Sequence, residues 1–181
     1  GGPAVEQIAR EGNRTAVALP IPLQYRKDFD FSYAGLKTAV RRKAEKLAEE
    51  HGVESTVQLP HNVKADIAAS FQHRAIQHVE QRLKYAMEAM EAEGISTLAV
   101  VGGVAANTEL RSRLKKMCES RKEDWTMFVP PPRLCTDQGA MSAWAAIERI
   151  MKGSSDEPSG QEVYARYPFA ALDVNADEEK I

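Results

Sequence analysis

The chain of 181 residues is poor in cysteine and in aromatic residues, and it contains no long apolar run. Its two cysteines, Cys118 and Cys135, are too few for a disulfide framework and form no CxxC pair, which indicates a reduced compartment. No apolar run approaches the roughly 18 residues of a membrane span, and we expect no membrane partner. No signal or transit peptide is visible, and a net charge of −2 excludes a strongly basic composition.

What is present is the composition of a globular domain with a core, 43% hydrophobic and 28% charged. The charge is unevenly distributed, because two basic and seven acidic residues follow from Gly153 onward while the preceding part is mildly basic. This distribution permits a polyanionic partner without requiring one. The basic run Arg41-Arg42-Lys43 could face such a partner, although basic runs on helices are more often solvated faces.

Apolar spacing and Gly or Pro residues divide the chain into successive elements. Helical spacing predicts helices over residues 3–10, 36–51, 62–93, 107–119 and 139–150. Short apolar or alternating runs predict strands over residues 29–33, 96–101 and 125–129. Asn62 is expected to cap the long helix. We expect one domain over residues 1–152, a GSSDEPSG linker over 153–160, and a closing segment with an acidic tail over 161–181.

The order strand, Gly-Gly, helix, strand, Pro loop, helix is typical of an α/β layer with parallel pairing. Ligands of such sheets bind where the carboxyl ends of the strands lead into helices. Gly102-Gly103 and Thr136-Asp137 both occupy that position. We therefore expect the two loops to face one ligand.

The stretch VVGGVAANTEL, residues 100–110, has two interpretations. Gly102 and Gly103 would let a ligand approach the backbone, the following helix would offer free N–H groups, and Asn107 would offer amide donors and an acceptor. The alternative is a tight strand-to-helix turn that Asn107 merely caps.

Asp137 also has two interpretations. Its carboxylate suits a hard or borderline metal cation, whereas Asp or Thr at a helix start is commonly a cap. A single carboxylate cannot hold a metal, and no two histidines have the spacing of four residues that places a pair on one helix face. The remaining ligands are therefore not visible in this chain.

A third stretch, FSYAGLKT over residues 31–38, contains Ser32, Lys37 and Thr38, which could reach a phosphate or a polar substrate. The equally weighted alternative is a strand end that leads into a capped helix. Cys135 has no histidine nearby in the sequence, so a thiol mechanism is not expected. No nucleophile and base pair stands out, and we identify no catalytic residue.

Taken together, FDFSYAGLKTAV, VVGGVAANTELR and PPPRLCTDQGAMSAWA resemble the tRNA N6-adenosine threonylcarbamoyltransferase family in order and spacing. The opening GGP and the closing VYARYPFAAL also fit this family. The resemblance implies an actin-like ATPase fold of the sugar kinase and Hsp70 type, represented mostly by its second lobe with inserted long helices. It further implies transfer of a threonylcarbamoyl group from threonylcarbamoyl-AMP to N6 of adenosine 37 in tRNAs that read codons starting with A.

The resemblance also assigns roles to residues. Asn107 would contact the adenylate, Gly2 and Glu6 would bind its ribose or base region, and Gly102-Gly103 would lie against the nucleotide. Asp137 would be a ligand of one divalent metal ion, iron or zinc. The family's HxxxH pair and an Asp before GGP do not occur in this sequence. We therefore expect the chain to be the carboxyl-terminal part of the enzyme, inactive on its own.

The implied partners are tRNA and threonylcarbamoyl-AMP, with a homodimer as a further option. The FSYAGLKTAV and CTD forms resemble bacterial and mitochondrial members, which predicts a mitochondrial protein, or a cytoplasmic one if the source is bacterial. Two alternatives stay open. One is another ATP-dependent kinase or carbamoyltransferase of the same fold, and the other is a non-catalytic actin-like nucleotide-binding module.

Overall fold

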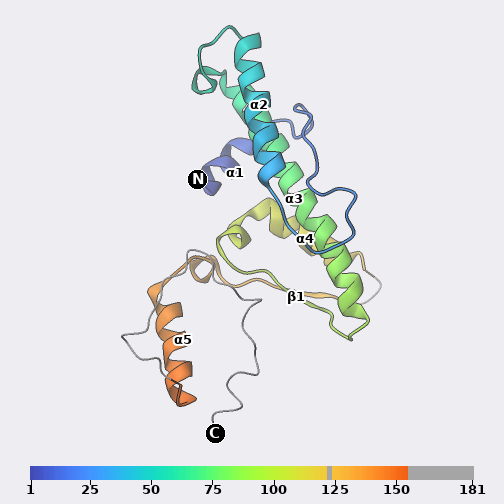
Figure 1. Cartoon of the computed structure of the whole chain (residues 1–181), viewed down its shortest axis with the longest axis vertical. Helices are drawn as coiled ribbons and strands as arrows, with labels where there is room; N and C mark the ends of the chain where they lie inside the picture. The colour runs from blue at the N-terminus through green and yellow to red at the C-terminus, as the bar shows by residue number, and fades with distance from the viewer. Residues whose placement is uncertain (122–123, 155–181) are drawn as a thin grey trace. The chain divides into compact units, whose positions relative to one another are not determined.

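The computed structural model describes residues 1–121 and 124–154. The chain divides after Asp137 into two compact units, and each is considered by itself. Among these described residues, the first unit has four α-helices, two strands and three short 3-10 helices, and the second has one α-helix (Figure 1). In chain order the elements are α1 Gly2–Ala9, α2 Ala34–Glu50, η1 Thr56–Gln58, α3 His61–Glu91, β1 Thr97–Ala99, η2 Gly103–Ala106, α4 Thr108–Glu119, β2 Thr126–Phe128, η3 Pro132–Leu134 and α5 Gly139–Met151.

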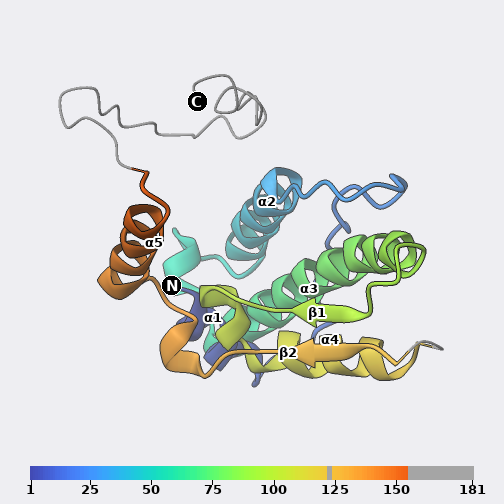
Figure 2. The ribbon, with the colours of Figure 1, turned by 90° about the horizontal axis from the view of Figure 1, so that it is seen from below.

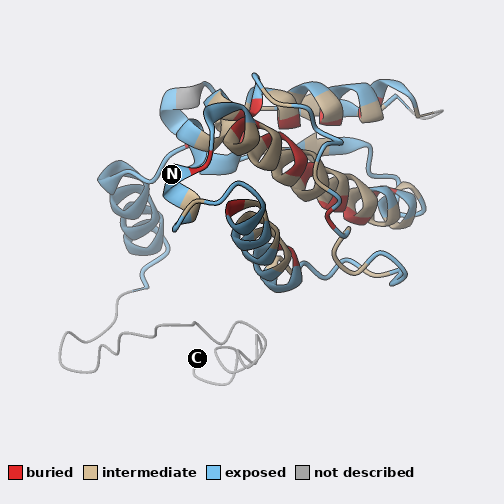
Figure 3. Cartoon of the chain, turned by 90° about the horizontal axis from the view of Figure 1, so that it is seen from above, coloured by how far each residue is buried: buried red, intermediate tan, exposed pale blue. Residues whose placement is uncertain are grey.

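All five predicted helices are present, and the longest of them, α3, is the centre of the first unit. Its apolar spacing buries residues along most of its length (Figure 3). The predicted cap at Asn62 is wrong, because α3 already begins at His61 and Pro60 is its N-cap residue. Asn62 therefore has helical backbone and lies within the first turn, where its side chain cannot act as the N-cap.

The parallel pairing predicted for the two later strands is confirmed. β1 pairs with β2 in the register Thr97 with Thr126, Leu98 with Met127 and Ala99 with Phe128 (Figure 2). Helix α4 follows β1 and precedes β2, as in a β-α-β unit. The main core cluster lies where α3 meets α4 and contains Ile76, Leu110 and Leu114, with Val79, Leu83, Val100, Met117 and Met127 packed against it.

The strand predicted over residues 29–33 is wrong, since this segment is irregular and pairs with no strand in the described part of the chain. The buried Arg82 side chain of α3 binds the irregular connection just before this segment. Its guanidinium donates hydrogen bonds to the carbonyls of Leu23, Arg26 and Asp28 and to the Asp28 carboxylate, at 2.7–3.1 Å. One buried side chain thus satisfies several backbone acceptors of the connection that leads into the segment.

A neighbouring histidine holds the next part of the same segment. Burial, reinforced by the charge of Arg82, lowers the pKa of His78. The neutral imidazole can accept a hydrogen bond from the Ser32 backbone N–H, which lies 3.4 Å from Nε2. The rings of Phe31 and Tyr33 both contact His78 edge to face at 5.3 Å between centroids. Together these contacts fix the position of Tyr33 at the start of α2.

Helix α1 is joined to α3 by the turn that follows it. The backbone at Gly12 approaches α3 so closely that an added Cβ would lie 2.0 Å from the Ala65 carbonyl oxygen. The next residue, Asn13, donates its backbone N–H to the Asp66 carboxylate at 2.7 Å. A glycine is required at this point for steric reasons.

The second unit contributes α5, and none of its side chains is buried among the described residues. The predicted linker and closing segment lie outside the described residues, apart from Gly153 and Ser154. Among the described residues, no helix is both long and apolar enough to cross a bilayer.

Candidate functional site

A mainly apolar cavity of about 430 Å³ collects residues from the separate sequence motifs. The GGP motif contributes Gly2, the FSYAG stretch contributes Tyr33, and the GGVAAN stretch contributes Val104 and Asn107. One wall comes from α3 and includes Phe71, Gln72, Ala75, Ile76 and Val79. The structure thus brings two of the predicted nucleotide-binding residues, Gly2 and Asn107, to one cavity.

Asn107 combines the two interpretations that its sequence context allowed. Its Oδ1 accepts a hydrogen bond from the Leu110 backbone N–H at 2.8 Å, so the residue does cap α4. Its Nδ2 donates to Oε1 of Gln72 on α3 at 3.2 Å. An amide nitrogen has two N–H groups, and within the described residues the second has no acceptor, so it can donate to a ligand in the cavity that Asn107 lines.

The Gly102-Gly103 junction is not a direct strand-to-helix turn, because the 3-10 helix η2 is inserted before α4. Gly102 has φ 83°, a left-handed conformation that favours glycine. A Cβ added at Gly103 would meet nothing within 4 Å, so its backbone is open to an approaching molecule. Within the described part of the chain, no acceptor is bonded to the N–H groups of Gly103 and Val104. These two donors could bind an anionic oxygen.

Glu6 lies at a different cavity, of about 270 Å³, which it lines together with Arg10, His73 and Thr108. Its Oε1 accepts hydrogen bonds from the backbone N–H and the hydroxyl of Thr108 and from Arg10. Burial acts to raise the pKa of Glu6, but these hydrogen bonds outweigh it and the pKa is lowered. Glu6 therefore links α1 to the first turn of α4, and the structure does not bring it to the cavity of Gly2.

Asp137 is exposed and is the last residue of the first unit. The alternative role as a helix cap is not found, since Gln138 is the N-cap residue of α5. The carboxylate suits a divalent cation, but no group of three or more His, Cys, Asp or Glu that could hold one occurs in the described residues. Asp137 thus offers a single ligand.

The histidines have other partners than Asp137. His61 contacts Glu11 at 2.8 Å, and His73 lies 3.0 Å from the guanidinium of Arg113. Of the other polar candidates, Thr38 donates its hydroxyl to the Ala34 carbonyl, and Lys37 lines a separate groove between α2 and α3. Neither Lys37 nor Thr38 lines the cavity of Gly2 and Asn107.

Sequence reasoning missed Tyr33, Phe71 and Gln72 as lining residues of the cavity. Tyr33 lies inside the noted FSYAGLKT stretch, and burial raises the pKa of its phenol. Gln72 is a polar residue beside the apolar positions Phe71 and Ala75, a pattern that could have marked it. Its bond to Asn107 depends on two elements that only folding brings together.

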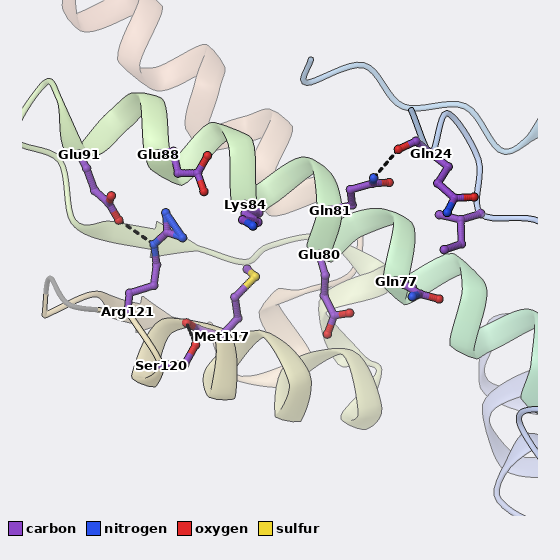
Figure 4. Close-up of a pocket in the computed structure, with 11 residues that line it drawn as sticks. Gln24, Gln77, Glu80, Gln81, Lys84, Glu88, Glu91, Met117, Ser120 and Arg121 are labelled. Carbon is purple, nitrogen blue, oxygen red and sulfur yellow. Dashed lines mark hydrogen bonds and ion pairs between the residues drawn. The ribbon is translucent and has the colours of Figure 1, made fainter. Parts of the chain in front are cut away.

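A larger hollow of about 790 Å³ lies between α3 and α4, and Figure 4 shows its polar lining. Three of its charged groups have partners within the protein: Glu91 accepts from Arg121 at 2.6 Å and from Trp125 at 2.7 Å, and Glu80 pairs with Arg113. None of the predicted site residues lines it. We therefore assign the candidate site to the smaller cavity.

The fold and the cavity define an α/β protein whose candidate site lies beside the glycine turn that follows β1. Residues 1–144 match the family model for tRNA N6-adenosine threonylcarbamoyltransferase, and the chain belongs to this family.

Relatives of this family occur in mitochondria and bacteria. The chain is 41% identical over 162 residues to the probable mitochondrial enzyme of Arabidopsis thaliana, covering 87% of this chain and 33% of the relative. It is 45% identical over 176 residues to the enzyme of Novosphingobium aromaticivorans, covering 97% and 45%. It is 39% identical over 158 residues to the mitochondrial enzyme of Xenopus tropicalis, covering 84% and 38%. The chain thus spans between a third and a half of these relatives.

Proposed function

We propose that the full-length protein transfers a threonylcarbamoyl group from threonylcarbamoyl-AMP to N6 of adenosine 37 in tRNAs that read codons starting with A. The observation that carries this proposal is the cavity where Gly2, Tyr33 and Asn107 meet from three distant motifs. Membership of the family supports it. In the same proposal, the two units are parts of an actin-like ATPase domain, of which this chain supplies one wall of the nucleotide cleft.

The cavity suits the adenylate in its chemistry. Phe71, Ile76 and Val79 give an apolar surface for a flat base. The free amide N–H of Asn107 would donate to a ribose hydroxyl or a phosphate oxygen. The unbonded N–H groups of Gly103 and Val104 would donate to the phosphate.

In the proposed reaction, the N6 amine of the tRNA adenosine attacks the carbonyl carbon of the mixed anhydride. A C–N bond forms, the C–O bond to the phosphate breaks, and AMP leaves with the electron pair while the amine loses a proton. The chain's own residues would hold the adenylate in line with the amine and donate hydrogen bonds to the phosphate as its charge develops.

Asp137 is proposed as one ligand of a divalent metal ion, iron or zinc. Such an ion acts as a Lewis acid that polarises a carbonyl or phosphate oxygen. Because the described residues offer no further ligands beside Asp137, the rest of the donor set is assigned to the longer part of the relatives that this chain does not span.

The proposed compartment is the mitochondrion, on the support of the mitochondrial relatives in Arabidopsis thaliana and Xenopus tropicalis. The bacterial relative is similar to the same degree and supports the cytoplasm instead. Fluorescence microscopy of the tagged full-length protein in its own source distinguishes the two.

The test is a transfer assay with the full-length protein, threonylcarbamoyl-AMP labelled in its threonine, and a tRNA transcript with adenosine 37. We expect label in the tRNA and none in a matched transcript with guanosine 37. Label transferred to a small molecule instead would support another kinase or carbamoyltransferase of the fold. Adenylate binding without any transfer would support a non-catalytic nucleotide-binding module.

A further inference from the structure

A groove of about 690 Å³ runs along α2, on the side where the helix faces the connection before it. Its charged lining residues are Arg42, Lys43 and Lys46, and no carboxylate lines it. The rest of its wall consists of small or uncharged residues, among them Gly35 of α2 and Pro20 of the connection. The groove therefore presents cations beside a wall that a backbone could approach closely.

The positive charge of this face is largely uncompensated. Between residues 37 and 46 the chain has five cations and a single carboxylate, Glu45. Three of these cations line the groove, whereas Lys37 and Arg41 line the separate groove between α2 and α3. Arg41 lies 3.7 Å from Glu45, and Lys46 lies 3.7 Å from Glu50, in exposed pairs that salt screens and that contribute little. Arg42 and Lys43 have no salt-bridge partner within residues 1–121 and 124–154. A cluster of such cations on one face is the electrostatic signature of polyanion binding.

The groove begins next to the candidate site. Tyr33 lines the cavity of Gly2 and Asn107, and the next two residues, Ala34 and Gly35, line the groove. A helix rises 1.5 Å per residue, so the cations continue to about 18 Å beyond Ala34. A strand of nucleic acid in the groove would therefore run along the helix whose first residues adjoin the cavity.

The residues that line the groove favour binding of phosphate groups rather than of nucleic-acid bases or of an acidic protein. It contains no aromatic side chain on which a base could stack. It also lacks the buried aromatic or large apolar anchors that dominate protein interfaces, since its uncharged members are Ala, Pro, Gly and Thr. Contacts of Lys and Arg with phosphates position a nucleic acid without reading its sequence.

We propose that the groove of Arg42, Lys43 and Lys46 binds the phosphate backbone of the tRNA substrate beside the nucleotide that enters the cavity. This inference rests on the proposed function and assigns the substrate-binding surface within it. The surface acts in positioning, and its cations do not touch the reacting atoms.

The test compares two triple variants of the full-length protein with equal loss of charge. The first is Arg42→Ala, Lys43→Ala and Lys46→Ala. The control is Lys27→Ala, Lys115→Ala and Lys116→Ala, at exposed positions outside the groove. The dissociation constant of an unmodified tRNA transcript is measured over a series of salt concentrations, together with the affinity for threonylcarbamoyl-AMP and the melting temperature.

We expect the groove variant to bind tRNA on the order of tenfold more weakly or worse, and its salt slope to fall by about 2 to 3, near one unit for each lost phosphate contact. The KM for tRNA should rise while the adenylate affinity and the melting temperature stay those of the wild type. The control variant should keep most of the tRNA affinity and the salt slope.

If the wild type transfers the threonylcarbamoyl group but the groove variant keeps the wild-type salt slope, tRNA binding by the groove is rejected and the proposed function stands. Equal weakening in both triple variants would also overturn it, since net charge alone would then explain the loss. Retained tRNA binding with lost binding of poly-glutamate would assign the groove to an acidic protein and likewise overturn it. If only the groove variant binds tRNA more weakly and the wild type shows no transfer, the proposed function is rejected, whereas tRNA binding by the groove is supported.

Discussion

The Glu6 carboxylate accepts a hydrogen bond from the backbone N–H of Thr108 at 3.0 Å, across 102 residues of sequence. Glu6 lies on α1, which begins with Gly2, and Thr108 begins α4 directly after Asn107. This bond therefore fixes the distance between two walls of the candidate cavity. It also satisfies one of the N–H groups that the start of a helix leaves without an intrahelical partner.

The replacement Glu6→Gln should lower the free energy of unfolding at neutral pH, because the hydrogen bonds that lower the pKa of Glu6 favour its charged form. A lowered pKa means that this stabilisation is fully present above the unfolded value of 4.5 and is lost as the pH falls through the folded value. The difference between wild type and variant should thus shrink on acidification below pH 4.5. Urea denaturation of the full-length protein over a pH series measures it.

The matched control for this experiment is Glu49→Gln, at an exposed glutamate of α2. It should leave the pH dependence of stability unchanged. A constant difference between wild type and Glu6→Gln across the whole pH series would contradict the assignment.

Replacements at Asn107 separate its two roles. Asn107→Ala should cost about 1 kcal/mol of stability through loss of the cap and should also weaken adenylate binding. Asn107→Asp keeps a capping oxygen but loses the amide donors and adds a negative charge. It should restore stability without restoring adenylate affinity, as thermal denaturation and calorimetric titration with a non-hydrolysable adenylate can show. Wild-type adenylate affinity in Asn107→Asp would exclude a ligand contact by the amide.

The replacement Asp137→Ala should remove bound iron or zinc from the full-length protein, because one carboxylate ligand is lost from the proposed site. Metal content per protein chain, measured by mass spectrometry after gel filtration, is the readout. Asp124→Ala removes an exposed carboxylate elsewhere and should retain the metal. A full metal content in Asp137→Ala would reject this residue as a ligand.

The replacement Arg82→Met should destabilise the protein by about 1 to 3 kcal/mol, because it removes the buried guanidinium that donates to the connection before α2. Arg82 is 1% exposed, so water cannot replace the guanidinium in the native structure. Chemical denaturation measures the loss. Lys84→Met on the exposed side of the same helix should change stability by less than about 0.5 kcal/mol. Equal effects of the two would show that the Arg82 contacts contribute no net stability.

The local sequence pattern predicted structure reliably where the backbone hydrogen bonds form within a single element. The helical spacing over residues 62–93 predicted α3 almost to its ends, since its hydrogen bonds are internal and its apolar face is periodic. The alternation over residues 29–33 predicted a strand that does not form, because a strand needs a hydrogen-bonding partner and residues 31–33 instead contact His78 of α3. Of the GGVAAN stretch, Val104 and Asn107 line the candidate cavity, and η2 between its glycines and α4 was not foreseen.

The sequence alone determined the helices, the parallel strand order and the family, because these depend on periodicity, on turn residues and on motifs that lie within short stretches. Only the tertiary structure decided which motif residues meet. Gly2 and Asn107 line one cavity, whereas Glu6 turns to Thr108 and Asp137 has no second ligand among the described residues. These contacts join positions up to about a hundred residues apart, and a pattern within a short stretch of sequence cannot predict which distant residues will meet.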